Sequence, residues 1–190
     1  MTTVWLRCPF RGVTLKKDGF LMREEKMEKL VSYTIKTPLG KISIRVEEGL
    51  PACMTFAGEE AMCEAGQSPP PPAVEELIKA LKTYFSGGEV DSSMAEALIA
   101  YIDVTPFEEA VFREVAGIPP GETASYGEVA EMAGHPRAAR AVGNVMHSNP
   151  FPIIIPCHRV IKSDGSLGGY GGSEHVKAWL LDFEGAKDGR

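Results

Sequence analysis

Cys157 is the residue whose surroundings point most directly to chemistry, because His158 and Arg159 follow it in the sequence. A thiol becomes a strong nucleophile only as its thiolate, and a neighbouring base or positive charge favours that form. A free cysteine is more often a small buried hydrophobic residue, an interpretation that suits Cys53 and Cys63. Spacing alone therefore leaves a nucleophile and a structural thiol equally open for Cys157.

Three isoleucines bracketed by prolines precede this cysteine, over residues 152–156. The run is typical of a short buried strand or extended segment that holds the thiol in a fixed place. Adjacent side chains of an extended segment point to opposite sides, so we expect no direct contact between Cys157 and His158. A proton would then pass between them through a water molecule.

Two short helices are expected upstream of the cysteine. Ser125 and Glu128 have the spacing of a capping box, which opens a helix that Gly134 can end in a left-handed conformation. Pro136 stands where the next helix should start, and that helix is expected to run to about residue 148. Two short helices joined by a turn of about three residues are typical of a helix-turn-helix.

The second of these helices has one polar and one apolar face at roughly 100° per residue. The apolar face carries Val142, Val145 and Met146. The polar face offers two guanidinium groups, an amide and an imidazole, from Arg137, Arg140, Asn144 and His147. As the second helix of a helix-turn-helix, it is a candidate for contact with nucleic acid, although an ordinary surface helix has the same pattern.

The charge distribution agrees with a polyanionic partner more closely than the total charge does. The formal net charge is −6, yet residues 135–162 contain no acidic side chain and carry Arg137, Arg140, Arg159 and Lys162. A polyanion responds to such a local patch more than to the total. A solvated basic face remains an equal alternative.

The first half of the chain predicts a small unit of sheet and helix. Residues 41–46 alternate strictly between polar and apolar, and residues 33–36 with a Pro38-Leu39-Gly40 turn complete a β-hairpin. A proline-rich linker over residues 66–72 leads to an amphipathic helix over residues 74–85, which Gly87 and Gly88 end. A capping box at Thr105 then opens a mainly helical second unit.

Composition excludes several classes of protein. The 190 residues contain no apolar run long enough to span a membrane, and the N-terminus lacks the pattern of a secretion signal. The four cysteines are scattered, without the Cys and His spacing of a zinc site. We therefore expect an intracellular, cytoplasmic protein with independent thiols and no metal.

Several motifs together make the interpretation specific. Ile-Pro-Cys-His-Arg-Val over residues 155–160 follows Asn149-Pro150 and the run Arg-Ala-Ala-Arg-Ala-Val-Gly of residues 137–143. Gly-Gly-Tyr-Gly-Gly over residues 168–172 and Lys-Ala-Trp-Leu-Leu-Asp-Phe-Glu over residues 177–184 come after it. This set resembles the signature of the O6-alkylguanine–DNA alkyltransferases, strongly over residues 105–185 and weakly over residues 31–88.

The resemblance implies an α+β fold. In that fold a small ribonuclease-H-like N-terminal domain, residues 31–95, precedes a mainly helical, winged helix-turn-helix-like domain, residues 105–185, that holds the DNA-binding face and the active site. Residues 1–30 match nothing in the family and would be an N-terminal extension.

The activity implied by the resemblance is DNA repair by direct reversal of damage. The alkyl group of O6-alkylguanine in duplex DNA, with O4-alkylthymine as a second candidate, would move irreversibly to a cysteine after the base has been flipped out. Nothing in the sequence places a second thiol or a cofactor to remove the alkyl group, so we expect one turnover for each molecule. The partner would be duplex DNA, bound through its minor groove with little sequence preference by a monomer.

The resemblance assigns five catalytic residues. Cys157 would be the nucleophile and alkyl acceptor, His158 would draw its proton through a water, and Glu184 would orient the imidazole. Tyr126 would donate its hydroxyl to the guanine ring. Asn149 would join the helix-turn-helix to the active-site segment.

Arg140 would enter the base stack and fill the gap left by the flipped nucleotide. The DNA-binding residues implied are Arg137, Ala139, Arg140, Asn144 and Tyr126. The base pocket would be formed by Tyr126, Cys157, Val160, Tyr170 and Gly171, with the carbonyl groups of Cys157 and Val160 accepting from the guanine amino group.

Some features depart from the family pattern. His147 stands where relatives often carry a fixed cation, and Gly171 where some have a serine. Tyr126 could merely pack, Asn149 could be a helix C-cap and Glu184 a solvated acid. A non-enzymatic lesion sensor on the same fold, a DNA-binding regulator with an incidental cysteine and a Cys–His hydrolase are the competing functions. The acceptor thiol argues against the sensor, and the combination of thiol and base-flipping residues argues against the other two.

Overall fold

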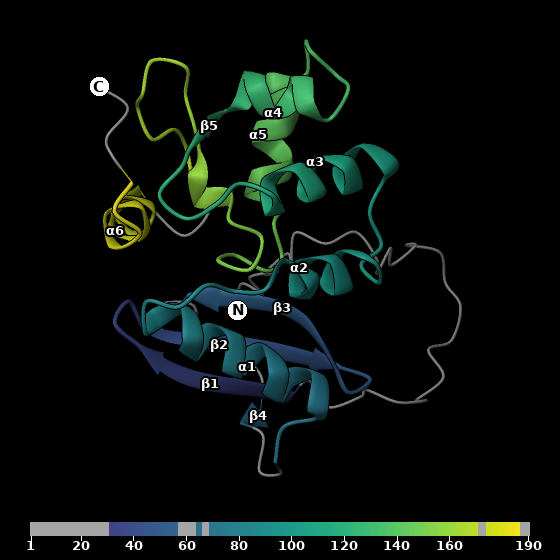
Figure 1. Cartoon of the computed structure of the whole chain (residues 1–190). Helices are drawn as coiled ribbons and strands as arrows, with labels where there is room; N and C mark the ends of the chain where they lie inside the picture. The colour runs from purple at the N-terminus through teal and green to yellow at the C-terminus, as the bar shows by residue number, and fades with distance from the viewer. Residues whose placement is uncertain (1–30, 57–63, 66–68, 171–173, 187–190) are drawn as a thin grey trace, which may run out of the picture.

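The structure, a computed structural model, describes residues 31–56, 64–65, 69–170 and 174–186 (Figure 1). The extension predicted over residues 1–30 and the pocket residue Gly171 lie outside the described residues. The described chain mixes helix and sheet, as expected, with a layer of strands below a group of helices (Figure 1).

A four-stranded sheet forms the lower layer in Figure 1. Its strands β1 (Val31–Thr37), β2 (Gly40–Glu47), β3 (Leu50–Phe56) and β4 (Glu64–Ala65) lie in the order β3-β2-β1-β4. The predicted hairpin is confirmed, because β1 and β2 pair antiparallel and Gly40 turns the chain with a φ of 103°. We did not predict β3, which pairs antiparallel with the other side of β2.

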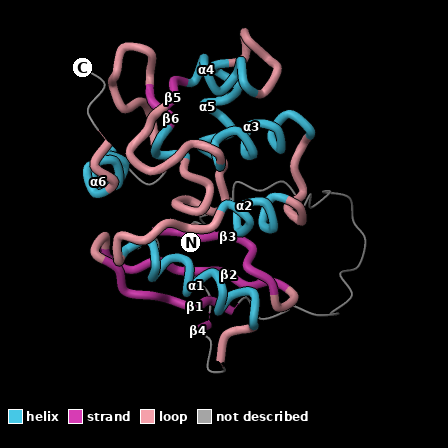
Figure 2. Tube along the Cα trace, in the orientation of Figure 1, coloured by secondary structure: helices cyan, strands magenta, loops and turns pink. Residues whose placement is uncertain are grey.

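Helix α1 (Pro72–Phe85) lies across this sheet and confirms the predicted amphipathic helix (Figure 2). Val74, Leu77 and Leu81 are fully buried in one core with Ile42 and Ile44 of β2. Beyond the C-cap at Ser86, Gly87 takes a φ of 82°, a left-handed conformation that favours glycine. We call β1–β4 and α1 together the sheet layer.

A second helix, α2 (Ser92–Ile99), was not predicted. Asp91 caps it by accepting a hydrogen bond from the Ser93 N–H at 2.9 Å. The helix buries Ala95, Leu98 and Ile99 and packs against the next helix, α3 (Pro106–Ala116). Residue 95, the predicted end of the first domain, falls inside this helix, and the division into domains stays a prediction.

The upper part of the molecule is mainly helical (Figure 1). Its four helices, which we call the helical layer, are α3, α4 (Tyr126–Met132), α5 (Ala139–His147) and α6 (Glu174–Phe183). Both predicted capping boxes are present, at Thr105 with Glu108 and at Ser125 with Glu128. A short parallel pair, β5 (Ala124–Ser125) with β6 (Val160–Ile161), joins the start of α4 to the segment after Cys157.

For the second helix of the predicted helix-turn-helix, the expected start was wrong, whereas the expected end near residue 148 is confirmed. Helix α5 begins at Ala139 instead of Pro136, so the link from α4 spans residues 133–138 rather than about three residues (Figure 2). Gly134 ends α4 with a φ of 78°, as expected, but the chain then makes a further turn closed by the Ala138 N–H donating to His135 O at 2.9 Å. Pro136 and Arg137 lie in that turn, and α5 starts with no side-chain cap.

One continuous hydrophobic core joins the two layers. It contains Leu77 of α1, Phe112 of α3, Val142 of α5 and Phe151 of the following loop, all at most 1% exposed. No helix within the described part of the chain has both the length and the apolar character needed to cross a membrane. Cys157 is itself a buried member of this shared core.

Candidate active site

The loop after α5 is tied into a compact turn by Asn149. The Asn149 Nδ2 group donates to Ile155 O at 2.7 Å, and its Oδ1 atom accepts from the Phe151 N–H at 3.0 Å. A further backbone bond joins the Ile155 N–H to Phe151 O at 2.9 Å. Asn149 therefore fastens both ends of the turn that leads from α5 to Cys157, which is more than a helix C-cap does.

The extended segment predicted for the three isoleucines was wrong. The segment is buried as expected, but residues 152–155 form a turn closed by a bridge between Pro152 and Ile155. Ile153 takes a φ of 78°, which is strained for a β-branched residue. The Asn149 hydrogen bonds and the burial of the three isoleucines hold the chain in this conformation.

Cys157 and His158 lie in a short 3₁₀ helix, η1 (Cys157–Arg159), which the Arg159 N–H closes by donating to Pro156 O at 2.9 Å. The expected alternation of Cys157 and His158 across an extended chain is therefore wrong, because side chains of a 3₁₀ turn do not point to opposite sides. Cys157, His158 and Arg159 are all buried. Burial of two ionisable side chains beside a thiol requires specific partners.

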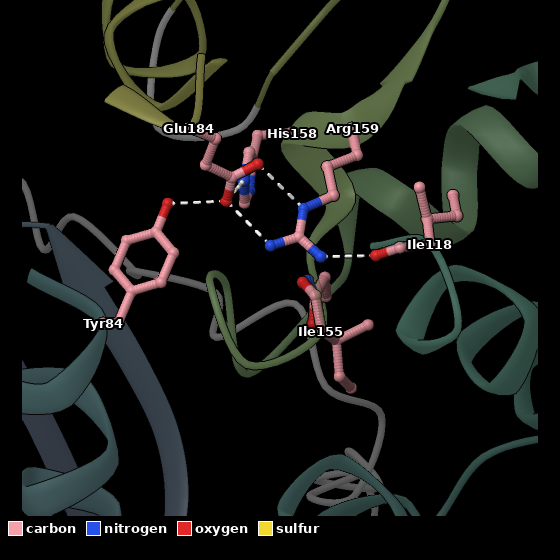
Figure 3. Close-up of polar contacts among 7 residues, drawn as sticks. Tyr84, Ile118, Ile155, His158, Arg159 and Glu184 are labelled. Carbon is pink, nitrogen blue, oxygen red and sulfur yellow. Dashed lines mark hydrogen bonds and ion pairs between the residues drawn. The ribbon is translucent and has the colours of Figure 1, made fainter. Parts of the chain in front are cut away.

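Glu184 supplies the partner of His158 (Figure 3). Its Oε1 atom lies 2.8 Å from His158 Nε2, and the His158 and Glu184 side chains are 0% and 2% exposed. The alternative of a solvated acid at Glu184 is therefore wrong. Because the carboxylate can only accept, His158 Nε2 must carry the hydrogen, and Nδ1 is left as the basic nitrogen. Nδ1 is buried and has no hydrogen-bond partner among the described residues.

Arg159 holds the other side of the same carboxylate. Its Nε donates to Glu184 Oε2 at 2.9 Å and its Nη2 to Oε1 at 2.8 Å, while Nη1 donates to the carbonyl oxygen of Ile118 (Figure 3). Burial alone would raise the pKa of Glu184, but hydrogen bonds from His158 and Arg159 outweigh it and lower this pKa to about 2. Glu184 is therefore ionised at neutral pH.

His158 is neutral at rest. Burial lowers the pKa of its imidazole, and Glu184 opposes this shift. The positive charges of Arg159 and Lys177 lower the pKa further. A neutral imidazole with a free Nδ1 can accept a proton, which is the capacity a general base needs.

Burial raises the pKa of the Cys157 thiol, so the sulfur is protonated at neutral pH. Contacts from Asn149, Lys177 and Tyr170 act in the opposite direction and favour the thiolate. The Tyr170 hydroxyl lies near Cys157, and burial raises its pKa, so this hydroxyl stays protonated. The thiol thus needs a base to ionise, and the groups around it favour the ion once it forms.

Lys177 is a site residue that our sequence reasoning missed. It is fully buried in α6, where its Nζ donates to Val160 O at 2.5 Å and lies 5.7 Å from the centre of the Tyr126 ring. Burial lowers its pKa to about 8, although nearby Cys157 opposes the shift. The available signal was a lone lysine between Val176 and Leu180, in the buried stripe of an amphipathic helix.

The carbonyl of Val160, which we expected to accept from guanine, is therefore already bonded to Lys177. A carbonyl oxygen has two lone pairs and can accept a second hydrogen bond. Tyr170, also expected in the base pocket, lies next to Cys157. Residues Val160, Tyr170 and Cys157 are thus brought together, as the sequence motifs implied.

A groove of about 690 Å³ lies between the start of α4 and α5. It is lined by four predicted DNA-binding residues and by His147, namely Tyr126, Ala139, Arg140, Asn144 and His147. Arg137, the fifth predicted residue, does not line it, because it stands in the turn before α5 begins. The wall of the groove carries the guanidinium of Arg140, together with Lys162 and Asp164.

Tyr126 connects this groove to the thiol. Its hydroxyl donates to Gly169 O at 3.4 Å. Burial raises its pKa, and the nearby Cys157 raises it further. Gly168, with a φ of 71°, allows the close approach, since a Cβ there would stand 2.9 Å from the Tyr126 hydroxyl oxygen. Tyr126 therefore lines the groove and lies near Cys157, and donation of its hydroxyl to guanine stays a prediction.

No group of three or more His, Cys, Asp or Glu side chains that could hold a metal ion occurs among residues 31–56, 64–65, 69–170 and 174–186. The described site consists of one thiol, one neutral base with its carboxylate, two buried cations and hydroxyl donors. Such a set can ionise a thiol and support a nucleophilic displacement.

Comparison with known proteins agrees with this chemistry. Residues 106–186 match the family described as "6-O-methylguanine DNA methyltransferase, DNA binding domain". The methylated-DNA–protein-cysteine methyltransferase of Mus musculus is 33% identical over 178 residues, covering 85% of this chain and 84% of the mouse protein. The human enzyme of the same name is 36% identical and covers 83% and 81% of the two chains.

The chain belongs to the methylated-DNA–protein-cysteine methyltransferase family. A solved structure of Mycobacterium tuberculosis OGT in complex with DNA agrees with the fold, with a TM-score of 0.65 and 33% identity over 82% of this chain and 93% of that one. The resemblance predicted from the sequence motifs is therefore confirmed, and the chain is an enzyme of the methyltransferase family. The matched segment, residues 106–186, contains every described site residue named above.

Proposed function

We propose that this protein repairs alkylated DNA by moving the alkyl group of O6-alkylguanine to Cys157. Family membership supports DNA repair by alkyl transfer. The observation that carries the assignment of Cys157 is its burial in η1 beside a neutral His158, whose free Nδ1 can take the thiol proton. Tyr126, which lies near Cys157, also lines the groove that carries Arg140.

The displacement balances with the groups present. The Cys157 proton passes through a water to His158 Nδ1, and Glu184 stabilises the imidazolium through Nε2. The sulfur forms a bond to the alkyl carbon, the bond from that carbon to O6 breaks, and its electron pair stays with the guanine. Tyr126 passes its hydroxyl proton to the ring, so the base leaves in neutral form, and the proton held by the His158 imidazolium returns through water to restore the tyrosine. His158 and Glu184 thus drive ionisation, and Tyr126 assists departure.

The product is a thioether, which has no easy reverse reaction. Cys53 and Cys157 are the two cysteines of the described residues, and Cys53 lies on β3 in the sheet layer whereas Cys157 lies in η1. We therefore expect a single turnover, with the protein acting as both catalyst and reagent and with no cofactor.

A guanine O6 substituent cannot be reached inside a duplex, so the nucleotide must be extruded at a cost of a few kcal/mol. Arg140 is long, cationic and placed at the groove wall, and it would fill the vacated stack. The slim start of α5, with Ala139 beside Arg140, suits the minor groove. If phosphate contacts dominate, binding has little sequence preference. We further propose that the protein binds DNA as a monomer and that O4-alkylthymine is a second candidate substrate.

The test is transfer of label from duplex DNA that carries radiolabelled O6-methylguanine. We expect label on the protein to stop near one equivalent, to be lost in Cys157→Ala and to be kept in Cys53→Ala, which removes the other cysteine of the described residues. Lesion binding without transfer would overturn the proposal in favour of a sensor. Indifference to the lesion would favour a DNA-binding regulator.

A further inference from the structure

Tyr84 of the sheet layer forms a hydrogen bond with Glu184, the carboxylate that is also bonded to His158. It stands in the last turn of α1, is 4% exposed and donates its hydroxyl to Glu184 Oε1 at 2.8 Å (Figure 3). Glu184 is 100 residues later in the chain, directly after α6. The contact therefore joins the sheet layer to the reactive site of the helical layer.

The position of Tyr84 is fixed by packing on both sides. Leu77 and Leu81, on the same face of α1, are fully buried in the core. The Tyr84 ring packs against Phe85 at 5.2 Å and against Phe183 of α6 at 5.5 Å between ring centres. The ring is thereby held with its hydroxyl toward Glu184. Burial raises the pKa of this hydroxyl, so it is a neutral donor at every working pH.

Glu184 Oε1 accepts three hydrogen bonds from two different elements: one from Tyr84 of α1, and two from His158 and Arg159 of η1. Each donor partly neutralises the negative charge of this oxygen, so a third donor weakens the electrostatic attraction between the oxygen and the other two donors. The Tyr84 hydroxyl also restricts the rotation of the carboxylate. A carboxylate fixed in this way keeps His158 in the tautomer whose Nδ1 is free.

We propose that Tyr84 is a positioning residue through which the sheet layer orients Glu184 and limits the negative charge that His158 meets. The inference rests on the proposed alkyl transfer. It assigns to the N-terminal half of the chain a part in the reaction, beyond support of the fold.

A second contact from the sheet layer reaches the other end of the site. The Met54 N–H, on the outer edge of β3, donates to Pro150 O at 2.8 Å, next to Asn149. The sheet layer thus holds both the loop before Cys157 and the carboxylate behind His158. This arrangement is what a scaffold that sets the geometry of the site requires.

The charged groups that face His158 limit what Tyr84 can change. They are Glu184 after α6, Arg159 of η1 and Lys177 of α6, and Tyr84 acts from α1 through Glu184. Without the Tyr84 hydroxyl, more of the Glu184 charge faces the imidazole. His158 would then hold a proton up to a higher pH and would cease to be a base there.

The experiment is Tyr84→Phe, which keeps the ring and removes only the hydroxyl. We expect the rate of transfer from free O6-benzylguanine to fall about threefold to tenfold at neutral pH. We also expect the acid limb of the pH–rate profile to move up by roughly half a pH unit. The matched control is Tyr101→Phe, which removes a hydroxyl that donates to Pro51 O at 2.7 Å and should leave the profile unchanged.

Two further measurements separate positioning from simple loosening of the structure. NMR titration of His158 in unreacted protein should show the same upward shift in Tyr84→Phe. In a Glu184→Gln background, removal of the Tyr84 hydroxyl should have no further effect on the profile. An unchanged profile and titration, or full additivity of the two substitutions, would overturn the inference. If the wild-type protein transfers no alkyl group, the proposed function fails instead, and the titration still tests Tyr84.

Discussion

Burial favours the uncharged forms of Cys157 and His158, and it therefore shifts their pKa values in opposite directions. It raises the pKa of the thiol and lowers that of the imidazole, so both are neutral at rest. Proton transfer would create a thiolate and an imidazolium, each with a buried partner of opposite charge: Lys177 for the sulfur and Glu184 for the ring. The site is therefore arranged for the charges of the reaction rather than for those of the resting protein.

At the same scale, Gly168 determines where the Tyr126 hydroxyl can lie. Gly168→Ala adds a Cβ at 2.9 Å from the Tyr126 oxygen and at a φ of 71°, so Tyr126 must move. We expect the rate of transfer from free O6-benzylguanine to fall about tenfold or more, since the hydroxyl loses its placement. Rates measured at neutral pH check this.

Gly169→Ala is the control for that substitution. A Cβ at Gly169 would meet nothing within 4 Å, and its φ is not in the left-handed region. Its rate should stay close to that of wild type. Equal loss in the two variants would show that backbone stiffness of this loop, and not the position of Tyr126, limits the reaction.

The sequence allowed prediction of the residues that we assign to the reaction, but not of those that contact them from distant parts of the chain. Cys157, His158 and Glu184 belong to motifs, and their proximity is confirmed. Tyr84 carried no such signal, because a tyrosine in the apolar stripe of a helix looks like any core residue. Its contact with Glu184 depends on how α1 and α6 pack, which no local pattern contains.

At the scale of elements, the start of α5 decides which arginine faces the groove. Arg140 lies within the helix and lines the groove, whereas Arg137 stands in the turn before it. We expect Arg140→Ala to lower transfer from duplex DNA by about tenfold or more, because nothing then fills the vacated stack. Transfer from free O6-benzylguanine, which needs no extrusion, should be unchanged.

Arg137→Ala removes the same charge from the same segment and is the matched variant. It should weaken DNA binding through charge alone, with a smaller effect on transfer that vanishes at high salt. Rates with both substrates at two salt concentrations distinguish the two arginines. A parallel loss with free O6-benzylguanine in Arg140→Ala would mean that this residue supports the pocket instead.

Elements with a cap or a regular period were predictable, and those without were not. Capping boxes predicted the starts of α3 and α4, and strict alternation predicted β2. Strand β3 was not predicted because Leu50–Phe56 contains Pro51 and is almost continuously apolar, without strict alternation. Helix α2 is only eight residues long and offers too little period to detect.

At the scale of the whole molecule, Glu184 is a point where α1, η1 and α6 meet. Glu184→Gln would leave the Arg159 guanidinium buried without its counter-ion, and we expect it to lower the free energy of unfolding by about 3 kcal/mol at neutral pH. Chemical denaturation, with Glu76→Gln on the exposed face of α1 as the control, measures the difference.

The same variant predicts a pH dependence. The pKa of Glu184 is lowered to about 2 in the folded protein from an ordinary value of 4.5. Its stabilising contribution is therefore complete above pH 4.5 and is lost as the pH falls through about 2. The difference between wild type and Glu184→Gln should shrink over that interval. A difference that stays constant down to pH 2 would mean that the charge of Glu184 contributes nothing.

The left-handed backbone of Ile153 makes the surroundings of the Cys157 thiol depend on the folded protein. Such a conformation costs of order 1–3 kcal/mol, and a free chain would relax out of it at once. Asn149 and the surrounding core hold it in place, and the 3₁₀ turn that carries the sulfur follows directly. A synthetic peptide with the same Pro-Cys-His-Arg letters would accordingly behave as an ordinary thiol.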